Sequence, residues 1–139
     1  MVDRAADAIE PIATSAVAPP AGHYSQGVSW RDLVFISGQL GQRPDGAHTA
    51  DAPFETQARQ ALANLLAVLA EAGCGPDDVL EVTAYVVGIE NWPPFNRIYA
   101  EQFGQARPAR AIVPVPALHH GYLVEVRAIG RRPATPQRP

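Results

Sequence analysis

The stretch from residue 54 to residue 72 constrains the fold more than any other part of this chain. Its apolar side chains recur at steps of three and four residues, and polar side chains fill the other side. This period predicts an amphipathic α-helix whose apolar stripe must pack on another element. Pro53 suits the first turn of this helix and Gly73 its end. The apolar positions are Ala58, Ala61, Leu62, Leu65, Leu66 and Leu69.

Short apolar segments on both sides of this helix predict the strands of a sheet. Before the helix, residues 33–37 form a partly β-branched run closed by Gly38, and a weaker strand is expected at 24–29. After it, residues 79–87 alternate between apolar and polar side chains, as a half-buried strand does. On one face of that strand we expect Leu80, Val82, Ala84 and Val86, and on the other Glu81, Thr83 and Tyr85.

A second helix and two further strands complete the pattern. Asn91 is suited to cap this helix, the prolines at 93 and 94 fit only its first turn, and Gly104 ends it. Two more strands are expected at 109–115 and 122–130. The order β-β-α-β-α-β-β predicts an α+β fold in which two helices pack on one face of a mixed sheet.

The opposite face of that sheet combines polar and apolar side chains. Thr83, Tyr85, Glu125 and Arg127 are too polar for the core of a monomer, yet valine, leucine and isoleucine accompany them. Such a face is typical of a surface covered by another chain. We therefore expect an oligomer built through it.

The length fits a single domain. A chain of 139 residues can bury a core without disulfides. We expect residues 17–130 to be folded, and residues 1–16 and 133–139 to be loose termini. No stretch approaches the roughly 20 apolar residues of a membrane helix, and the charged N-terminus does not resemble a secretion signal. These features predict a cytoplasmic protein with no membrane partner.

Charge and ligand content argue against several functions. The net charge of −3 gives no basic footprint for nucleic acid. One cysteine, Cys74, excludes an internal disulfide and a cysteine metal cluster. The histidines at 23, 48, 119 and 120 lack the helical His-x-x-x-His spacing of a zinc site, and the last two are expected in a loop. No metal and no organic cofactor is expected.

Arg110 and Glu125 are the candidates for chemistry, because each lies in strand-like, apolar surroundings. Charges there are costly to bury unless they are paired or used. An arginine can hold a carboxylate with two parallel hydrogen bonds, and a glutamate can move a proton or orient a water. Considered alone, these residues leave a structural alternative open, in which Glu125 forms a buried bridge to Arg127 or Arg110.

Six short motifs occur in a fixed order: GHYSQGV at 22–28, FISGQ at 35–39, QARQALANL at 57–65, FNRIY at 95–99, RPAR at 107–110 and LVEV at 123–126. Together they resemble the RidA/YjgF family of small imine deaminases. The resemblance covers residues from about 17 to 130. It implies a chorismate-mutase-like fold and a homotrimer with a cleft between subunits. In that family the cleft binds a small 2-imino or 2-keto acid, and water releases ammonia from the imine.

The resemblance also implies roles by position. Arg110 would bind the substrate carboxylate, helped by the backbone N–H of Gly38. Glu125 would orient or activate the attacking water, and Tyr24 would reach into the cleft from the neighbouring subunit. Two residues, Asn96 and Tyr99, would hold the wall of the site.

The chain departs from the family pattern next to the arginine. Ala111 and Ile112 stand where serine or threonine, and often cysteine, are usual, so the side chain of Ile112 would make the pocket wall more apolar. The backbone carbonyl of Ile112 can still face a substrate. His23 replaces a common proline, and would either titrate at the cleft mouth or only change a turn.

The function expected first is hydrolytic deamination of 2-imino acids or enamines to 2-keto acids and ammonia. One alternative is a pathway-specific enzyme of this kind that acts on a larger enamine. Another is a non-catalytic trimer that binds a keto acid for regulation. Endoribonuclease activity is disfavoured, since the chain lacks a basic stripe and an aromatic stacking platform.

Overall fold

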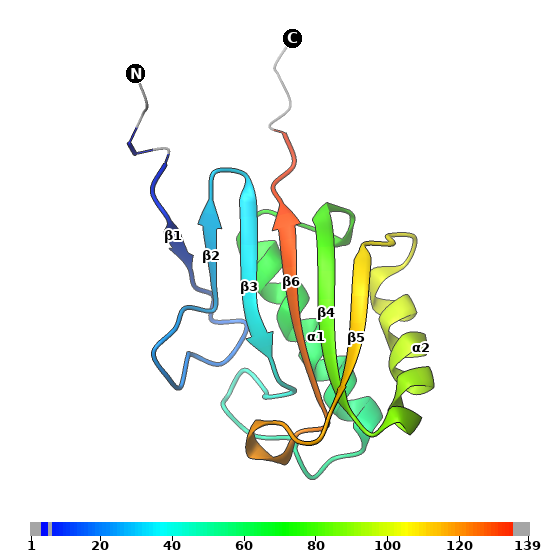
Figure 1. The fold of residues 1–139 in the computed structure, drawn as a ribbon. Helices are drawn as coiled ribbons and strands as arrows, with labels where there is room; N and C mark the ends of the chain where they lie inside the picture. The colour runs from blue at the N-terminus through cyan, green and yellow to red at the C-terminus, as the bar shows by residue number, and fades with distance from the viewer. Residues whose placement is uncertain (1–3, 6, 135–139) are drawn as a thin grey trace.

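A computed structural model describes residues 4, 5 and 7–134, which form one mixed sheet with both helices on one face (Figure 1). The sheet has six strands in the order β1-β2-β3-β6-β4-β5. Only β4 and β5 run parallel, and the other neighbours are antiparallel. The expected α+β architecture is confirmed. Its elements are β1 (Glu10–Ile12), β2 (Gly27–Trp30), β3 (Leu33–Gln39), α1 (Phe54–Glu71), β4 (Val79–Val87), α2 (Trp92–Phe103), β5 (Ala109–Val115) and β6 (Val124–Arg131), with short 3-10 turns η1 (Pro76–Asp78), η2 (Ile89–Asn91) and η3 (His119–Gly121).

Strand β1 is an addition to the expected order, and it lies within the segment expected to be loose. Its residues pair antiparallel with β2, and Ile12 is buried in the core. The buried side chain of Gln26 holds the following segment through hydrogen bonds to both backbone groups of Thr14 and to the carbonyl of Ala18. The expectation for residues 10–12 was wrong because a three-residue edge strand is too short to show an alternation. Of the expected C-terminal tail, residues 135–139 lie outside the described part.

The first helix matches its prediction closely. Of its expected apolar stripe, Leu66 is only partly buried and the other members are fully buried. The stripe packs across β3 and β6 and against α2. Gly73 follows the helix with a φ of +83°, the left-handed conformation that a glycine adopts without steric cost.

Two details of the sequence prediction need correction. Leu80 does not face the core beside Val82. It is 47% exposed, because the pairing of β4 with β6 shifts between Val79 and Glu81, and a bulge of this kind reverses the side-chain alternation. Asn91 precedes α2 without a capping hydrogen bond from its side chain, which instead donates to the carbonyl of Val87 at 2.9 Å.

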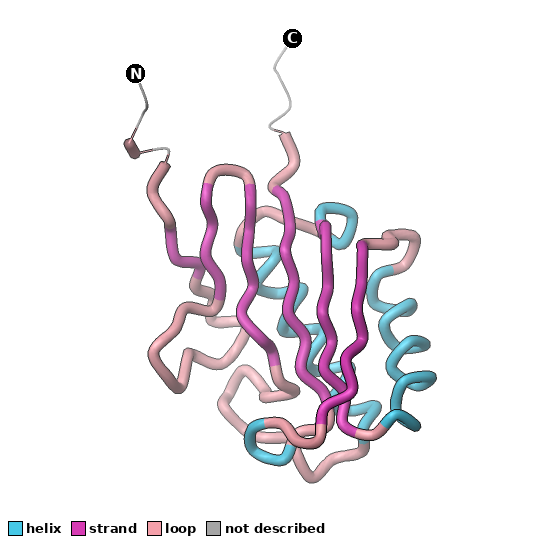
Figure 2. Tube along the Cα trace, in the orientation of Figure 1, coloured by secondary structure: helices cyan, strands magenta, loops and turns pink. Residues whose placement is uncertain are grey.

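The buried side chain of Gln57 joins α1 to two other segments. Its amide nitrogen donates to the carbonyls of Ala50 and Ala52, both at 3.0 Å, and its oxygen accepts from the N–H of Leu123 at 2.9 Å. Figure 2 shows how the loop before α1 and the η3 turn gather at one end of the sheet. This single amide therefore fixes the loops that border the open face.

Gln57→Leu should lower the free energy of unfolding by about 3 kcal/mol, because it leaves buried backbone groups without partners. Urea unfolding measures this loss. Gln60→Leu is the matched control, since the amide of Gln60 contacts Asn64 on the same helix, and its effect should be much smaller. Equal losses in the two variants would contradict this role of Gln57.

Candidate active site

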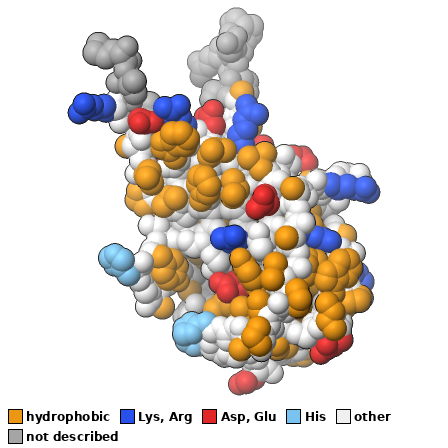
Figure 3. Space-filling model, viewed as in Figure 1, with side chains coloured by type: hydrophobic (Ala, Val, Ile, Leu, Met, Phe, Trp, Pro, Cys, Tyr) orange, Lys and Arg blue, Asp and Glu red, His pale blue; other side chains and the backbone are white. Residues whose placement is uncertain are grey.

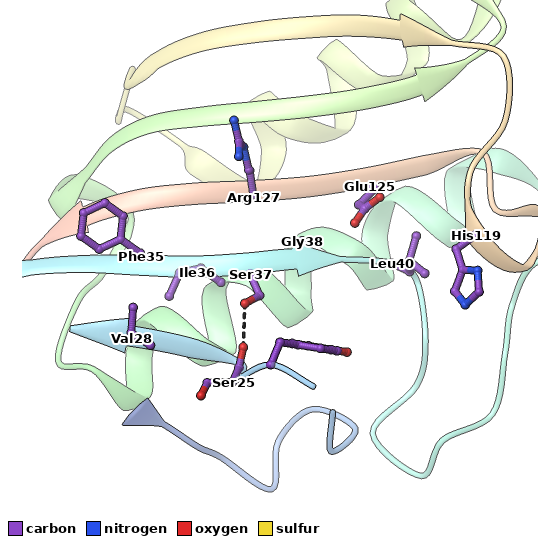
Figure 4. A pocket seen from close by; sticks show the side chains of 11 residues that line it. Ser25, Val28, Phe35, Ile36, Ser37, Gly38, Leu40, His119, Glu125 and Arg127 are labelled. Carbon is purple, nitrogen blue, oxygen red and sulfur yellow. Dashed lines mark hydrogen bonds between the residues drawn. The ribbon is translucent and has the colours of Figure 1, made fainter. Parts of the chain in front are cut away.

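A cavity of about 520 Å³ opens on the sheet face that the helices leave uncovered. It lies between β2, β3 and β6 and the η3 turn (Figure 4). Two serines close one side, where the hydroxyl of Ser37 donates to the carbonyl of Ser25 at 2.6 Å. The lining residues are Tyr24, Ser25, Val28, Phe35, Ile36, Ser37, Gly38, Leu40, His119, Glu125 and Arg127.

Glu125 lies against the backbone of Gly38 in this cavity. A Cβ atom at position 38 would collide with the carboxylate, and its distance to the Glu125 Cδ would be 3.0 Å. Glycine therefore permits the close approach of the carboxylate to β3. Burial raises the pKa of Glu125, and the positive charge of His119 partly opposes this shift. A carboxyl group with a raised pKa is suited to exchange protons near neutral pH.

The raised pKa of Glu125 makes the stability of the fold depend on pH. An unfolded glutamate titrates near ~4.3, so above that pH the folded chain binds more protons than the unfolded chain. The stabilisation is complete below the unfolded pKa and is lost as pH rises through the folded pKa. Glu125→Gln removes this titration, so we expect the variant to gain stability relative to the wild type as pH rises.

Urea unfolding at a series of pH values from about 4 to neutral measures the difference between Glu125→Gln and the wild type. Glu71→Gln, at an exposed position near the end of α1, controls for the loss of one negative charge. A stability difference for Glu125→Gln that stays constant with pH would show that the carboxyl group is not perturbed.

Arg110 lines a different cavity, of about 500 Å³, beside α2. Its guanidinium donates to the Asn96 side-chain oxygen at 2.9 Å and lies 4.7 Å from the ring centre of Tyr99 and 5.7 Å from that of Trp92. Burial raises the pKa of Tyr99 to about 12, and its buried hydroxyl has no hydrogen-bond partner among the described residues. One amide and two aromatic rings thus orient the guanidinium.

The single chain does not bring Arg110 and Glu125 together. Arg110 is in register with buried Val82, on the helix-covered face, whereas Glu125 is in register with Tyr85, on the open face. Paired positions on neighbouring strands point to the same side of a sheet, so the two charges lie on opposite faces. Neither forms an ion pair within the described residues, so the buried-bridge alternative is wrong for this chain.

The remaining predicted site residues divide between the two cavities. Tyr24, 55% exposed, and Gly38 accompany Glu125, while Asn96 and Tyr99 accompany Arg110. Ile112 lines neither cavity and packs its side chain against the core.

Three histidines and a tyrosine form a group that the sequence did not predict. The ring of His120 lies 3.8 Å from that of His119 and 4.5 Å from that of His48. His48 Nδ1 is 2.8 Å from the Tyr122 hydroxyl, which also accepts from the N–H of Thr49 at 3.1 Å. Seventy-one positions separate His48 from His119 (119 − 48), so no local pattern could have joined them.

Large apolar side chains remain exposed on the open face of the sheet. Phe35 is 38% exposed, Val113 37% and Leu80 47%. Figure 3 shows hydrophobic side chains gathered there around a few charged ones. In the described residues, no group of histidine, cysteine or acidic side chains is arranged to hold a metal ion, and no helix is long and apolar enough to cross a membrane.

The sequence matches a known protein family over most of its length. The family model described as Endoribonuclease L-PSP matches residues 15–131. A 2-iminobutanoate/2-iminopropanoate deaminase of Bos taurus is 36% identical over 122 residues, which cover 87% of this chain and 89% of the relative.

Solved structures agree with this match. The Rid-family protein YyfA of Yersinia pestis superimposes with a TM-score of 0.85 at 35% identity, covering 89% of this chain and 99% of that one. TdcF of E. coli, solved with bound serine, gives a TM-score of 0.84 at 29% identity, with coverage of 89% and 99%.

Proposed function

Since the chain belongs to the RidA/YjgF/RutC family, also called endoribonuclease L-PSP, we propose that it is a hydrolytic deaminase of 2-imino acids and enamines. It would release ammonia and a 2-keto acid, and so remove reactive metabolites. The observation that carries this proposal is Glu125, whose half-buried carboxyl has a raised pKa in a cavity open to solvent. Relatives named as 2-iminobutanoate/2-iminopropanoate deaminases, at 34–37% identity, support the substrate class.

The residues divide the chemistry into binding and proton transfer. Arg110 binds the substrate carboxylate, and the N–H of Gly38 helps to place it. Glu125 accepts a proton from the water that attacks the imine carbon, while Tyr24 confines the substrate. An imine next to a carboxylate is already electrophilic, so it needs orientation and a proton path more than a strong nucleophile. The reaction requires no metal or organic cofactor.

Two chains are needed to complete this site. Within one chain, Arg110 and Glu125 lie on opposite faces of the sheet. The open face also exposes Phe35 and Val113, which a second subunit would cover. We therefore assign each site to a cleft of a homotrimer, with Arg110 from one subunit, and Glu125, Gly38 and Tyr24 from its neighbour.

Turnover tests the proposal directly. 2-Iminobutyrate or 2-aminoacrylate is generated continuously by an amino-acid oxidase or dehydratase, and semicarbazide traps the imine that remains. The intact protein should accelerate imine loss, so that less semicarbazone forms. An unchanged yield of semicarbazone would rule out a general deaminase.

A trimer that binds a keto acid without turnover is the second candidate, and the bound serine in TdcF is the observation that favours it. Calorimetry with 2-ketobutyrate would detect such binding in a protein that leaves imine loss unchanged. A pathway-specific enzyme for larger enamines would instead accelerate loss of a bulkier imine alone.

A further inference from the structure

The η3 turn brings a titratable group into the Glu125 cavity that the proposed mechanism leaves unused. His119 lines this cavity, and the same side chain is exposed to solvent. Figure 4 shows its ring at the end of the cavity where Glu125 and Leu40 lie. A histidine in this position can exchange protons with both the solvent and a bound molecule.

The ring of His120 lies against the His119 imidazole. His120 has a φ of +59°, a left-handed conformation that is uncommon for a residue other than glycine. It places the ring of His120 against both His119 and His48. Desolvation, followed by the positive charges of His119 and His48, lowers the pKa of His120. The contact between the rings therefore disfavours protonation of His120 while His119 is protonated.

The groups that face His119 come from several elements. His120 lies on the same turn, His48 on the loop before α1, and Glu125 and Arg127 on β6, while Tyr24 precedes β2. Glu125 is the acidic member of this set. A protonated His119 favours its ionised form, as the direction of its effect on the Glu125 pKa indicates.

We propose that His119 is a second catalytic residue of this cavity, the acid that protonates the imine nitrogen while Glu125 takes the proton of the attacking water. This inference rests on the proposed deaminase function. The acid role belongs to the His119 imidazolium, and the base role to the Glu125 carboxylate. Such a division between two titratable groups is common in enzymes.

The proton balance closes over two steps. In the first step, the water oxygen forms the C–O bond and the C=N π pair moves to nitrogen. Glu125 accepts a proton from the water, and the His119 imidazolium gives a proton to the nitrogen. The carbinolamine then collapses to the keto acid. Neutral His119 accepts the hydroxyl proton, the C–N pair leaves with nitrogen, and protonated Glu125 supplies the proton that completes ammonia. Both residues return to their starting states.

The test compares pH profiles of kcat/KM for the wild type, His119→Gln and Glu71→Gln in the semicarbazide assay. The wild type should show a bell-shaped profile, with activity that rises as the general base ionises and falls as the general acid loses its proton. His119→Gln should lose the alkaline limb and about 100-fold in kcat. Glu71→Gln removes a titratable side chain at an exposed position near the end of α1, outside the cavity lining, and should keep the wild-type profile.

Chemical rescue separates proton transfer from a structural role. Added imidazole should restore part of the activity of His119→Ala, and should leave the wild type unchanged. Wild-type activity in His119→Gln, a retained alkaline limb, or failure of imidazole to restore His119→Ala would each overturn the role of His119, with the deaminase function intact. An inactive wild type would instead overturn the deaminase function, and the proposed role with it.

Discussion

Arg110→Ala should reduce kcat/KM for 2-iminobutyrate by roughly 10²- to 10⁴-fold, because two charged hydrogen bonds to the substrate carboxylate contribute about 1.5–3 kcal/mol each. The loss should appear with little change in stability, since the guanidinium is only partly buried and its contacts are one amide oxygen and two aromatic rings. The semicarbazide assay measures the rate, and urea unfolding measures the stability.

Two further variants make the Arg110 experiment specific. Arg110→Lys keeps the positive charge but not the planar pair of donors, so it should fall between Arg110→Ala and the wild type. Arg97→Ala removes another arginine in the middle of α2, where Arg97 forms an exposed ion pair with Glu55 at 2.8 Å. This control should keep its activity. Full activity in Arg110→Ala would show that the carboxylate is bound elsewhere.

The sequence predicted those elements whose evidence is local. The period of the apolar stripe, together with Gly73, placed α1 almost to the residue. Strands β4 and β5 also have the predicted bounds. Both kinds of element carry a regular pattern over seven or more residues, because one face of each must be buried.

Features that depend on pairing between strands distant in sequence could not be predicted from the sequence. Leu80 does not face the core because the pairing of β4 with β6 shifts next to it. Strand β1 forms because its three residues pair with the edge of β2. The placement of Arg110 and Glu125 on opposite faces has the same origin. Alternation within one strand gives two faces, but the register with its neighbours decides which face the helices cover.

The histidine group shows the same limit for a functional site. His119 follows β5 in sequence, and the contact of the neighbouring His120 ring with His48 requires the loop before α1 to fold back to the η3 turn. Backbone geometry at His120, which no composition rule encodes, completes the arrangement. By contrast, Gly38 and Glu125 lie in motifs that carry the family resemblance. A Cβ atom at position 38 would collide with the Glu125 carboxylate, which explains why a glycine is needed beside Glu125.

Mixing two inactive variants should restore activity if the site is shared between subunits. In a cyclic trimer assembled at random from equal amounts of Arg110→Ala and Glu125→Gln protomers, about one quarter of the clefts combine an intact Arg110 with an intact Glu125. We therefore expect roughly one quarter of the wild-type kcat from the mixture, although each variant alone is nearly inactive. Co-expression of the two variants at equal levels, followed by purification on one tag that both carry and the semicarbazide assay, gives this measurement on the unselected mixture.

The mixing experiment also tests the placement of the two residues on opposite faces of one chain. If both came from the same subunit, every cleft of the mixture would lack one of them, and no activity would return. Mixing the separately assembled variants without subunit exchange is the control, and should give only the sum of their residual rates. Recovery after exchange would require that the Arg110 of one chain works with the Glu125 of another, as we propose from their positions on opposite faces of one chain.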